Sequence, residues 1–396
     1  MNHSDFSYDV GVIGGCGHVG LPLALLIASK RRRVLIYDID EQAVARVRAG
    51  TMPFREDGAD ALLAADLAAD ALDCTTGPAE LAKCRVIILI VGTPVDEHLN
   101  PSFDAIPRAL ERCLPFLRDE QVLVLRSTVY PGTSAKVQRW LRSRGLNTSV
   151  AFCPERVAQG HSLREFAALP QIVSAFDERG MQVVQELFRS MTDDLVVMQP
   201  MEAELAKLLT NAWRYIQFAT VNQFYMIAER HGLDFDRILE GSKHNYPRLA
   251  GMPGPGYAAG PCLFKDTMQL AAFSQNQFFL GHAAMLVNEG LPAFVVEQLA
   301  QKLPLAERTV GILGMSFKAE SDDPRSSLSY KLKKILTLQA RRVLCTDPYV
   351  SDRELVPLEQ VLAEADAIIV GTPHQAYRSV SVRPGVVVMD VWSVLS

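Results

Sequence analysis

The feature that most constrains the fold is a glycine-rich turn between a strand and a helix near the start of the chain. Tyr8–Ile13 (YDVGVI) is an apolar run of strand length, and the longer apolar segment LPLALLIASK follows it. Between them the glycines have the spacing Gly15-x-Gly17-x-x-Gly20. In this order the first glycine makes the turn, the second admits a pyrophosphate, and the third lets the helix pack on the strand.

A second strand, Val34–Tyr37, ends in Asp38. A carboxylate at this distance accepts hydrogen bonds from a ribose diol and repels a 2′-phosphate, so the sequence predicts NAD rather than NADP. The pyrophosphate would lie at the helix N-terminus, where free N–H groups favour anions. The expected cofactor contacts in this region are Gly15, Gly17, His18, Val19, Gly20 and Asp38.

Further strands are predicted at residues 86–91, 122–125, 149–152 and 195–198, with helical segments such as Ala59–Leu72 between strands. This alternation implies a parallel, doubly wound sheet with ligands over the carboxyl ends of its strands. Thr93, Pro94 and Thr128 follow strands and are candidate cofactor contacts, although threonines are also common in ordinary turns and caps. Glu155, which leaves a strand at the same edge, is a candidate functional carboxylate.

Residues 201–300 have a helical pattern. Glu202–Arg230 is predicted to form one long helix, on which Lys207 and Asn211 are four residues apart and share a face. A solvated surface pair is the ordinary interpretation, but Asn211 lies among apolar residues, and such a pair can hold a reacting oxygen. A second helix at Phe279–Leu303 contains Asn288-Glu289, a pair without an assigned role.

The segment Arg248–Asp266 (RLAGMPGPGYAAGPCLFKD) is rich in glycine and proline and contains Cys262. This composition argues against a helix or a central strand and predicts a rigid loop. Lys265 and Asp266 follow the thiol closely, and a nearby cation favours the thiolate, so the loop is a candidate for covalent catalysis. A structural turn with a buried, inert cysteine is the alternative.

The last hundred residues repeat the pattern of the first. Thr309–Leu313 matches YDVGVI, Arg342–Asp347 (RVLCTD) matches RVLIYD, and AIIVGTP matches IILIVGTP. The loop after the first repeated strand lacks the glycine spacing and contains Lys318 instead. With Arg325 in the polar segment that follows, this loop predicts a second nucleotide-like ligand.

These patterns predict an α/β protein with two Rossmann-like doubly wound parallel-sheet domains, joined by a helical central domain with one long helix. The expected domains are residues 1–200, 201–300 and 301–396, with Cys262 in the cleft between the sheet domains. A net charge of −5 gives no support to binding of nucleic acid or anionic membranes. We find no signal peptide and no apolar run near the ~20 residues of a membrane span. Seven scattered cysteines argue against a disulfide framework or a metal site, so we expect a reduced, cytoplasmic protein.

Six motifs in this order resemble those of the nucleotide-sugar dehydrogenases, the family that includes UDP-glucose, UDP-N-acetylmannosamine and GDP-mannose dehydrogenases. The likeness covers essentially the whole chain. The motifs are Gly15–Gly20, Ser127–Val129, Pro154-Glu155, Lys207-x-x-x-Asn211, Arg248–Asp266, and Phe317-Lys318 with Asp322–Ser327.

The resemblance implies oxidation of a sugar C6 alcohol to a carboxylate with two NAD. Asp266, with Lys207 nearby, would take the alcohol proton through a water, and Cys262 would capture the aldehyde. Lys207 and Asn211 would stabilise the oxyanion, and Asp266 or Glu155 would activate the water that releases the acid. Thr128 completes the candidate catalytic group.

The resemblance also implies ligand contacts and an assembly. Arg248 would reach the substrate of a neighbouring subunit, which predicts a homodimer, and Arg325 would hold a cofactor or substrate phosphate. The substrate, a nucleotide-sugar and most simply a UDP-sugar, would contact Glu155, Arg156, Val157, Lys207, Asn211, Arg248, Tyr257, Gly260 and Lys318.

Two departures from the UDP-glucose enzymes bear on the substrate. Gln159 stands where many of them have a second glutamate, and the loop before Cys262 is one residue longer, with Pro261 before the thiol. The segments Pro154–Val157 and Pro253–Gly256 favour an N-acetylated UDP-hexosamine, while UDP-glucose stays open. Two alternatives remain: a two-electron β-hydroxyacid dehydrogenase, which needs no catalytic cysteine or second sheet domain, and a non-catalytic protein that binds NAD or nucleotide-sugars.

Overall fold

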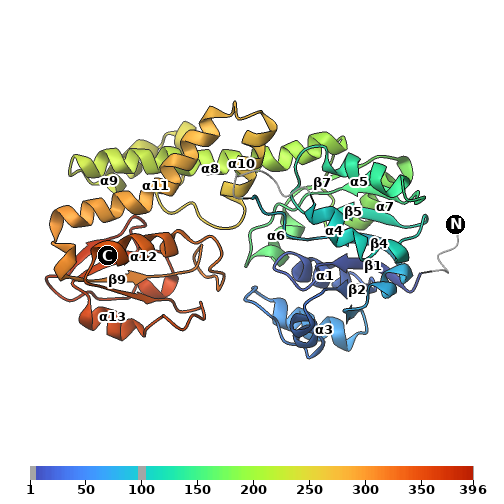
Figure 1. The fold of residues 1–396 in the computed structure, drawn as a ribbon, viewed down its shortest axis with the longest axis horizontal. Coiled ribbons are helices and arrows are strands. Elements are labelled where there is room, and N and C mark those ends of the chain that lie inside the picture. The colour runs from blue at the N-terminus through green and yellow to red at the C-terminus, as the bar shows by residue number, and fades with distance from the viewer. Residues whose placement is uncertain (1–5, 97–103, 396) are drawn as a thin grey trace. The chain divides into compact units, whose positions relative to one another are not determined.

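The structure is a computed structural model that describes residues 6–96 and 104–395. The chain divides into two compact units, residues 1–209 and 210–396, each with its own parallel or mostly parallel sheet (Figure 1). The predicted α/β class with two Rossmann-like sheets is confirmed.

The first unit contains an eight-stranded sheet in the order β3-β2-β1-β4-β5-β6-β7-β8. Neighbouring strands are parallel except for β6 and β7, which pair antiparallel and correct the expectation of a wholly parallel sheet. The strands are β1 (Tyr8–Ile13), β2 (Val34–Tyr37), β3 (Leu72–Thr75), β4 (Cys84–Leu89), β5 (Val122–Leu125), β6 (Ser149–Phe152), β7 (Gln171–Ala175) and β8 (Leu195–Val197).

Both faces of this sheet are buried, because successive residues of its strands face two different apolar clusters. In β5, Val124 packs in one cluster and Leu123 in the other, and neither is exposed to solvent. Each fully buried aliphatic side chain of this kind contributes about 1.5–3 kcal/mol to folding. The helices that accompany the sheet are α1 (Gly20–Ser29), α2 (Glu41–Arg48), α3 (Ala59–Ala68), α4 (Ala105–Glu111), α5 (Thr133–Arg142), α6 (Ser162–Ala168) and α7 (Glu178–Arg189).

The second unit contains a four-stranded parallel sheet in the order β10-β9-β11-β12. The repeat predicted from the sequence is therefore present as a second, smaller sheet. Its strands are β9 (Thr309–Leu313), β10 (Arg342–Thr346), β11 (Ala367–Val370) and β12 (Val387–Met389), and its helices are α9 (Phe235–Lys243), α10 (Leu263–Phe273), α11 (Phe279–Lys302), α12 (Leu328–Gln339) and α13 (Leu358–Glu364).

The predicted long helix is α8 (Pro200–Arg230), which continues from the first unit into the second. By length and composition, α11 is long and apolar enough to cross a membrane, a property that the sequence analysis missed. It nevertheless packs as a core helix, because Val295 and Leu299 are buried in the apolar cluster of the second unit.

The structure corrects the expected loop around the candidate nucleophile. Helix α10 begins at Leu263, directly after Cys262, so Lys265 and Asp266 lie in its first turn. The physical reason is local: the glycines and prolines end at Pro261, and LFKDTMQLAAF contains neither. Three short strands, β3, β7 and β12, were also missed.

The turn after β1 generates a stability prediction. Gly14 has φ of 74°, and a Cβ there would lie 1.9 Å from the carbonyl oxygen of Ile90, whereas Gly145 has φ of 79° and open space around its Cβ position. We expect Gly145→Ala to lose about 1–2 kcal/mol for the left-handed backbone. Gly14→Ala should lose a further ~1–3 kcal/mol, because the Ile90 carbonyl must move. Equal midpoints in urea unfolding of the two cofactor-free variants would contradict this account.

Candidate active site

The glycine loop after β1 has the geometry of a dinucleotide site. A Cβ at Gly20 would lie 2.5 Å from the carbonyl oxygen of Gly14, so this glycine allows the helix to pack closely on the turn. At Gly17 the one neighbour of such a Cβ is the same oxygen at 3.6 Å, which leaves room for a ligand. Gly14 itself carries the positive φ of the turn; the sequence analysis had assigned the turn to Gly15.

Donors for a pyrophosphate and an acceptor for a ribose lie beside this loop. No side chain of the described residues caps α1, and its first turn contains no acidic residue, so its N–H groups suit an anion. The Asp38 carboxylate accepts the N–H of Cys16 at 2.9 Å and that of Asp40 at 3.1 Å, which holds it next to the loop. These residues fit NAD.

His18, inside the glycine spacing, is held by two side chains of the first unit. Its Nδ1 lies 3.0 Å from Nε2 of Gln159, and its ring centroid lies 4.1 Å from that of Phe54. Gln159, which replaces the second glutamate of many UDP-glucose enzymes, therefore orients a residue of the predicted cofactor loop.

Hydrogen bonds join the ends of β4 and β5. The Thr93 hydroxyl donates to the carbonyl of Thr128 at 2.6 Å, and the Ser127 hydroxyl contacts both the N–H and the carbonyl of Val91 at 2.8 Å. The structure thus brings together the two threonines expected at the cofactor site, Thr93 and Thr128.

Glu155 is tied into a buried ion pair that the sequence analysis did not anticipate. One of its oxygens lies 2.5 Å from the guanidinium of Arg126, whose side chain is completely buried. The other oxygen accepts the N–H groups of Arg156 at 2.6 Å and Val157 at 2.9 Å. Breaking such a buried pair costs several kcal/mol, on the order of 3–5. This geometry favours a structural role for Glu155, which fixes the turn after β6, over the expected role as a base.

The two residues after Glu155 also use their side chains within the first unit. The Arg156 guanidinium donates to the carbonyl of Pro170, and Val157 packs against the apolar cluster of one sheet face. Both were expected to contact substrate. In this structure their side chains anchor the segment within the first unit.

Asn211 and Asp266, 55 residues apart, meet in the second unit. The Asn211 amide donates to one oxygen of Asp266 at 2.6 Å, and the ammonium of Lys265 lies 2.8 Å from the other. Asp266 is fully buried, and Lys207, one helical turn before Asn211 on α8, is buried as well. One N–H of Asn211 is thus committed to Asp266, and the amide carries a second N–H.

Cys262 lies at the N-terminal end of α10 and is exposed. Hydrogen bonds to Asp323 raise the pKa of the Arg325 guanidinium, and the charge on Cys262 acts in the same direction. In general, a cation or a helix N-terminus next to a cysteine favours the thiolate over the thiol. Arg325, whose guanidinium is paired with Asp323 at 2.6 Å, is therefore a second cation near the thiol, in addition to the expected Lys265.

The other six cysteines are buried, and burial suppresses their ionisation. It raises the pKa of Cys113, Cys153 and Cys345 to about 11 and that of Cys74 and Cys84 to about 12. The pKa of Cys16 is raised further, for the same reason. All seven cysteines lie in the part of the chain that the structure describes, and Cys262 alone among them is accessible.

Two buried asparagines fix the loop that leads to Cys262. The Asn222 side chain accepts the N–H of Gly256 at 2.8 Å and donates to the carbonyl of the same residue at 2.9 Å. Asn288 accepts a hydrogen bond from Asn222 at 2.9 Å and donates to the carbonyl of Tyr215 at 3.0 Å. Asn288, to which the sequence analysis gave no role, therefore connects α11, α8 and the loop.

The remaining predicted substrate residues differ in accessibility. Tyr257 is buried in the apolar core of the second unit, edge-on to Trp392, so its side chain faces the core rather than a ligand. Gly260 donates its N–H to the carbonyl of Ser326 at 3.1 Å. Arg248 is exposed, with its guanidinium 3.3 Å from the Tyr246 hydroxyl.

The contrast between the cysteines predicts selective alkylation. At pH 7.5 under native conditions, iodoacetamide should modify one thiol per chain, at Cys262, because the buried thiols are inaccessible and protonated. Peptide mass mapping before and after denaturation measures this. Cys262→Ser should remove the native modification and leave six sites in urea; modification of two or more cysteines in the folded protein would contradict the account.

Comparisons with known proteins identify the family of the chain. Residues 8–192 match the NAD binding domain of the UDP-glucose/GDP-mannose dehydrogenase family, residues 201–289 its central domain, and residues 311–396 its UDP binding domain. The chain is 29% identical over 379 residues to UDP-N-acetyl-D-mannosamine dehydrogenase of Pyrococcus horikoshii, covering 93% of this chain and 90% of that protein. It is 27% identical over 397 residues to NDP-N-acetyl-D-galactosaminuronic acid dehydrogenase of Ralstonia nicotianae, with coverage of 94% and 93%.

Solved structures give the same result. The Pyrococcus horikoshii UDP-D-ManNAc dehydrogenase superposes with a TM-score of 0.91 at 27% identity, over 98% of this chain and 96% of that chain. A UDP-glucose dehydrogenase from Pyrobaculum islandicum superposes with a TM-score of 0.89 at 26% identity, over 98% and 95%. The chain therefore belongs to the UDP-glucose/GDP-mannose dehydrogenase family and is an NAD-dependent oxidoreductase of nucleotide-sugars.

Proposed function

We propose that the enzyme oxidises the C6 hydroxyl of a UDP-sugar to a carboxylate in two steps through a covalent adduct on Cys262. The observation that carries this proposal is the exposed thiol at the start of α10, beside the charge of Arg325. Asp266 lies in the first turn of the same helix and accepts a hydrogen bond from Asn211 of α8. The N-terminal end of α10 and the residues near it therefore provide a nucleophile (Cys262), a cation (Arg325) and a hydrogen-bonded carboxylate (Asp266).

The thiol makes the second oxidation possible, because an aldehyde has no good hydride to give until a nucleophile adds to it. Bound at the glycine loop, NAD would accept one hydride in each oxidation. The Cys262 thiolate adds to the aldehyde carbon to form a thiohemiacetal, and loss of hydride from that carbon leaves a thioester. Water then cleaves the carbon–sulfur bond, which releases the carboxylic acid and regenerates the thiol.

The neighbouring side chains supply proton transfer and charge stabilisation. Asp266 is oriented by Asn211 and Lys265, and we assign it to hold the water that accepts the alcohol proton and later attacks the thioester. Lys207 and the second N–H of Asn211 stabilise the oxyanion, a contribution of about 3–4 kcal/mol for a well-placed donor. Glu155, committed to Arg126, is the weaker candidate for the base.

For the sugar we propose an N-acetylated UDP-hexosamine. The names of the Pyrococcus and Ralstonia relatives, which span more than 90% of this chain, support it. A pocket of about 470 Å³ beside the Cys262 loop supports a bulky ligand; it is lined by residues that include Gly260, Phe264, Ser327 and Lys331. In this scheme Lys318 and Arg325 contact the nucleotide part or the cofactor phosphate, and Thr128 the reacting centre.

We retain the domain boundaries 1–200, 201–300 and 301–396 and a cytoplasmic location as further proposals. We also propose a homodimer, in which Arg248 reaches the partner's substrate. Exposed apolar side chains on two helices of the second unit support it: Trp213, Phe224 and Ile227 on α8, and Phe279, Leu280 and Leu286 on α11. Exposed apolar patches of this kind mark protein interfaces.

The stoichiometry of NADH tests the oxidation. With excess NAD and a limiting sugar from a panel of UDP-N-acetylhexosamines and UDP-glucose, we expect two NADH per sugar, followed at 340 nm. Cys262→Ser should give no more than one and should lower the steady rate by on the order of 10³-fold or more. One NADH per sugar in the unsubstituted enzyme would instead indicate the two-electron alternative. NAD binding without turnover across the panel would indicate a binding protein.

Light scattering after gel filtration tests the dimer. We expect a mass of twice the chain's 43.7 kDa, and Trp213→Glu should shift it towards one chain, because a charge would be buried in the interface. Leu338→Glu is the matched control, since Leu338 is 89% exposed and lies on α12 rather than on α8 or α11. An unchanged mass for Trp213→Glu would remove α8 from the interface.

A further inference from the structure

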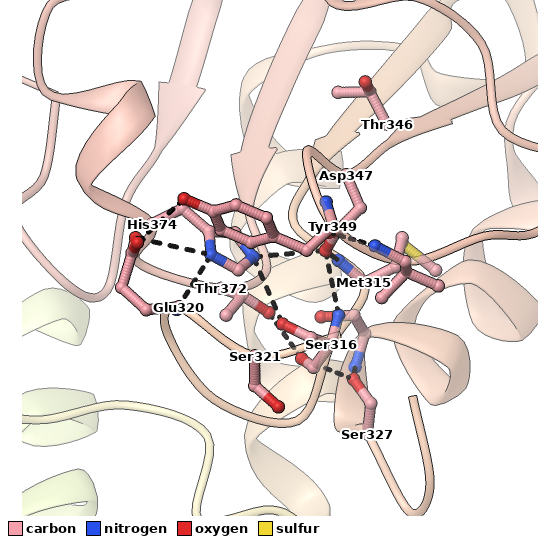
Figure 2. Close-up of polar contacts among 12 residues, drawn as sticks. Met315, Ser316, Glu320, Ser321, Ser327, Thr346, Asp347, Tyr349, Thr372 and His374 are labelled. Carbon is pink, nitrogen blue, oxygen red and sulfur yellow. Dashed lines mark hydrogen bonds and ion pairs between the residues drawn. The ribbon is translucent and has the colours of Figure 1, made fainter. Parts of the chain in front are cut away.

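A buried histidine and a buried aspartate lie at the carboxyl edge of the second sheet. NAD is expected at the corresponding edge of the first sheet. Asp347 directly follows β10, and His374 lies in the loop after β11. Both side chains are completely buried, and the His374 Nε2 lies 3.1 Å from an Asp347 oxygen (Figure 2). This pair belongs neither to the cofactor loop nor to the group around Cys262.

By the internal repeat, Asp347 is the counterpart of Asp38, yet its carboxylate is fully used by the protein. One oxygen accepts the N–H groups of Met315 at 2.6 Å and Ser316 at 3.0 Å, and the other accepts those of Tyr349 and Val350. Burial by itself would raise the pKa of Asp347, but the bonds from His374 and these N–H groups lower it to about 2. The acceptor capacity that Asp38 offers to a ribose is therefore filled by the imidazole.

The hydrogen bonds also define the protonation of the imidazole. The backbone N–H of Glu320 donates to Nδ1 of His374 at 3.0 Å, so Nδ1 is an acceptor and the proton resides on Nε2, which faces Asp347. The rings of Tyr349 and Tyr377 contact the imidazole edge-on, with centroids 5.1 and 5.5 Å away. His374 thus joins the backbone at Glu320 to the carboxylate in one orientation (Figure 2).

Glu320 belongs to the segment Gly314–Ser327, which we call the Lys318 loop. Glu320 has φ of 56° and Ser326 has φ of 54°, values that cost non-glycine residues about 1–2 kcal/mol each. Contacts around the loop must offset this cost. Besides the bond to His374, the Ser316 hydroxyl donates to the carbonyl of Lys318 at 2.8 Å, and the Thr372 hydroxyl donates to that of Ser316 at 2.6 Å.

The Lys318 loop also contacts the segment that leads to Cys262. A Cβ at Gly260 would lie 2.5 Å from the ring of Phe317, so the ring packs directly on the glycine. The N–H of Gly260 donates to the carbonyl of Ser326. A displacement of the Lys318 loop would therefore move both its lysine and the backbone two residues before the nucleophile.

We propose that His374 is a positioning residue that holds the Lys318 loop in its ligand-binding shape through Asp347 and the N–H of Glu320. The proposal rests on the proposed function, since it takes the UDP part of the substrate as the ligand of this loop. In this proposal the His374 imidazole is bonded to Asp347 of the second sheet, whereas its counterpart Asp38 in the first sheet would bind the ribose of NAD. The ligand of the second sheet would then bind at the Lys318 loop.

Three substitutions separate the two bonds of the imidazole. His374→Gln places an amide N–H near the position of Nε2 and keeps the bond to Asp347, while His374→Asn places an oxygen near Nδ1 and keeps the bond to Glu320. His374→Phe keeps the ring but loses both bonds and also the contact of Nε2 with the Ser316 hydroxyl at 3.1 Å. A bond to a charged group is worth about 10- to 100-fold in an equilibrium constant, and we expect the dissociation constant of UDP to rise by at least about 10-fold in His374→Phe.

Calorimetric titration with UDP, and separately with NAD, gives the readout. We expect His374→Gln and His374→Asn to lie between the unsubstituted protein and His374→Phe for UDP, while NAD affinity is unchanged because its loop belongs to the first sheet. His231→Phe, at an exposed histidine after α8, is the control and should bind UDP normally. Parallel losses of NAD and UDP affinity would indicate general unfolding and overturn the proposal.

The outcomes distinguish this proposal from the proposed function. If the unsubstituted protein binds UDP and all three variants bind UDP as tightly as it does, His374 does not position the loop. The inference then fails, while the proposed function is unaffected. If the unsubstituted protein binds NAD but not UDP, the assignment of a UDP-sugar fails, and this proposal fails with it. If His374→Phe does not fold, the UDP affinities of the Gln and Asn variants still test the proposal. Weaker binding than in the unsubstituted protein supports it, and equal binding overturns it.

Discussion

The direction of the strands is the constraint on which both units depend. Parallel strands end at the same edge of a sheet, so every loop after a strand emerges there, however far apart the loops lie in sequence. In the first sheet this collects the glycine loop, Asp38, Thr93 and Thr128; in the second it collects Asp347 and His374. The direction of the strands therefore brings these residues to one edge of each sheet. The side chains that follow the strands there differ between the two sheets, and so does the ligand expected at each edge.

Buried carboxylates then fix the loops at these edges. Glu155 is held by Arg126 and two backbone N–H groups, and Asp347 by four N–H groups and an imidazole. Glu56 accepts the N–H groups of Gly160 and Ser162 and anchors the segment after Glu155 in the same way. An acid costs several kcal/mol to bury unless its hydrogen bonds are satisfied, so each such group specifies one loop conformation and penalises the others.

The fold followed from the sequence because apolar strands, glycine spacing and the internal repeat are local signals. The strands β1, β2, β5, β6 and β9 begin and end where the pattern placed them. β3 (LDCT) and β7 (QIVSA) were missed because they are short and carry polar residues. The pairing of Arg126 with Glu155, of Asn222 with Asn288 and of His374 with Asp347 joins distant positions, and nothing in one sequence indicates which distant polar residues meet. The motifs predicted regions of the chain, whereas the polar partners within those regions follow only from the three-dimensional structure.

The relation between Asp38 and Asp347 has a consequence for how the enzyme tells its two ligands apart. Two copies of one nucleotide-binding unit in a single chain would compete for the same cofactor if both kept an open ribose acceptor. In the second copy the corresponding carboxylate, Asp347, is bonded to four backbone N–H groups and to His374 of the same chain. On the proposal that Asp38 binds the ribose of NAD, the second sheet would offer the cofactor no such carboxylate, and discrimination there would need no separate contact that rejects NAD.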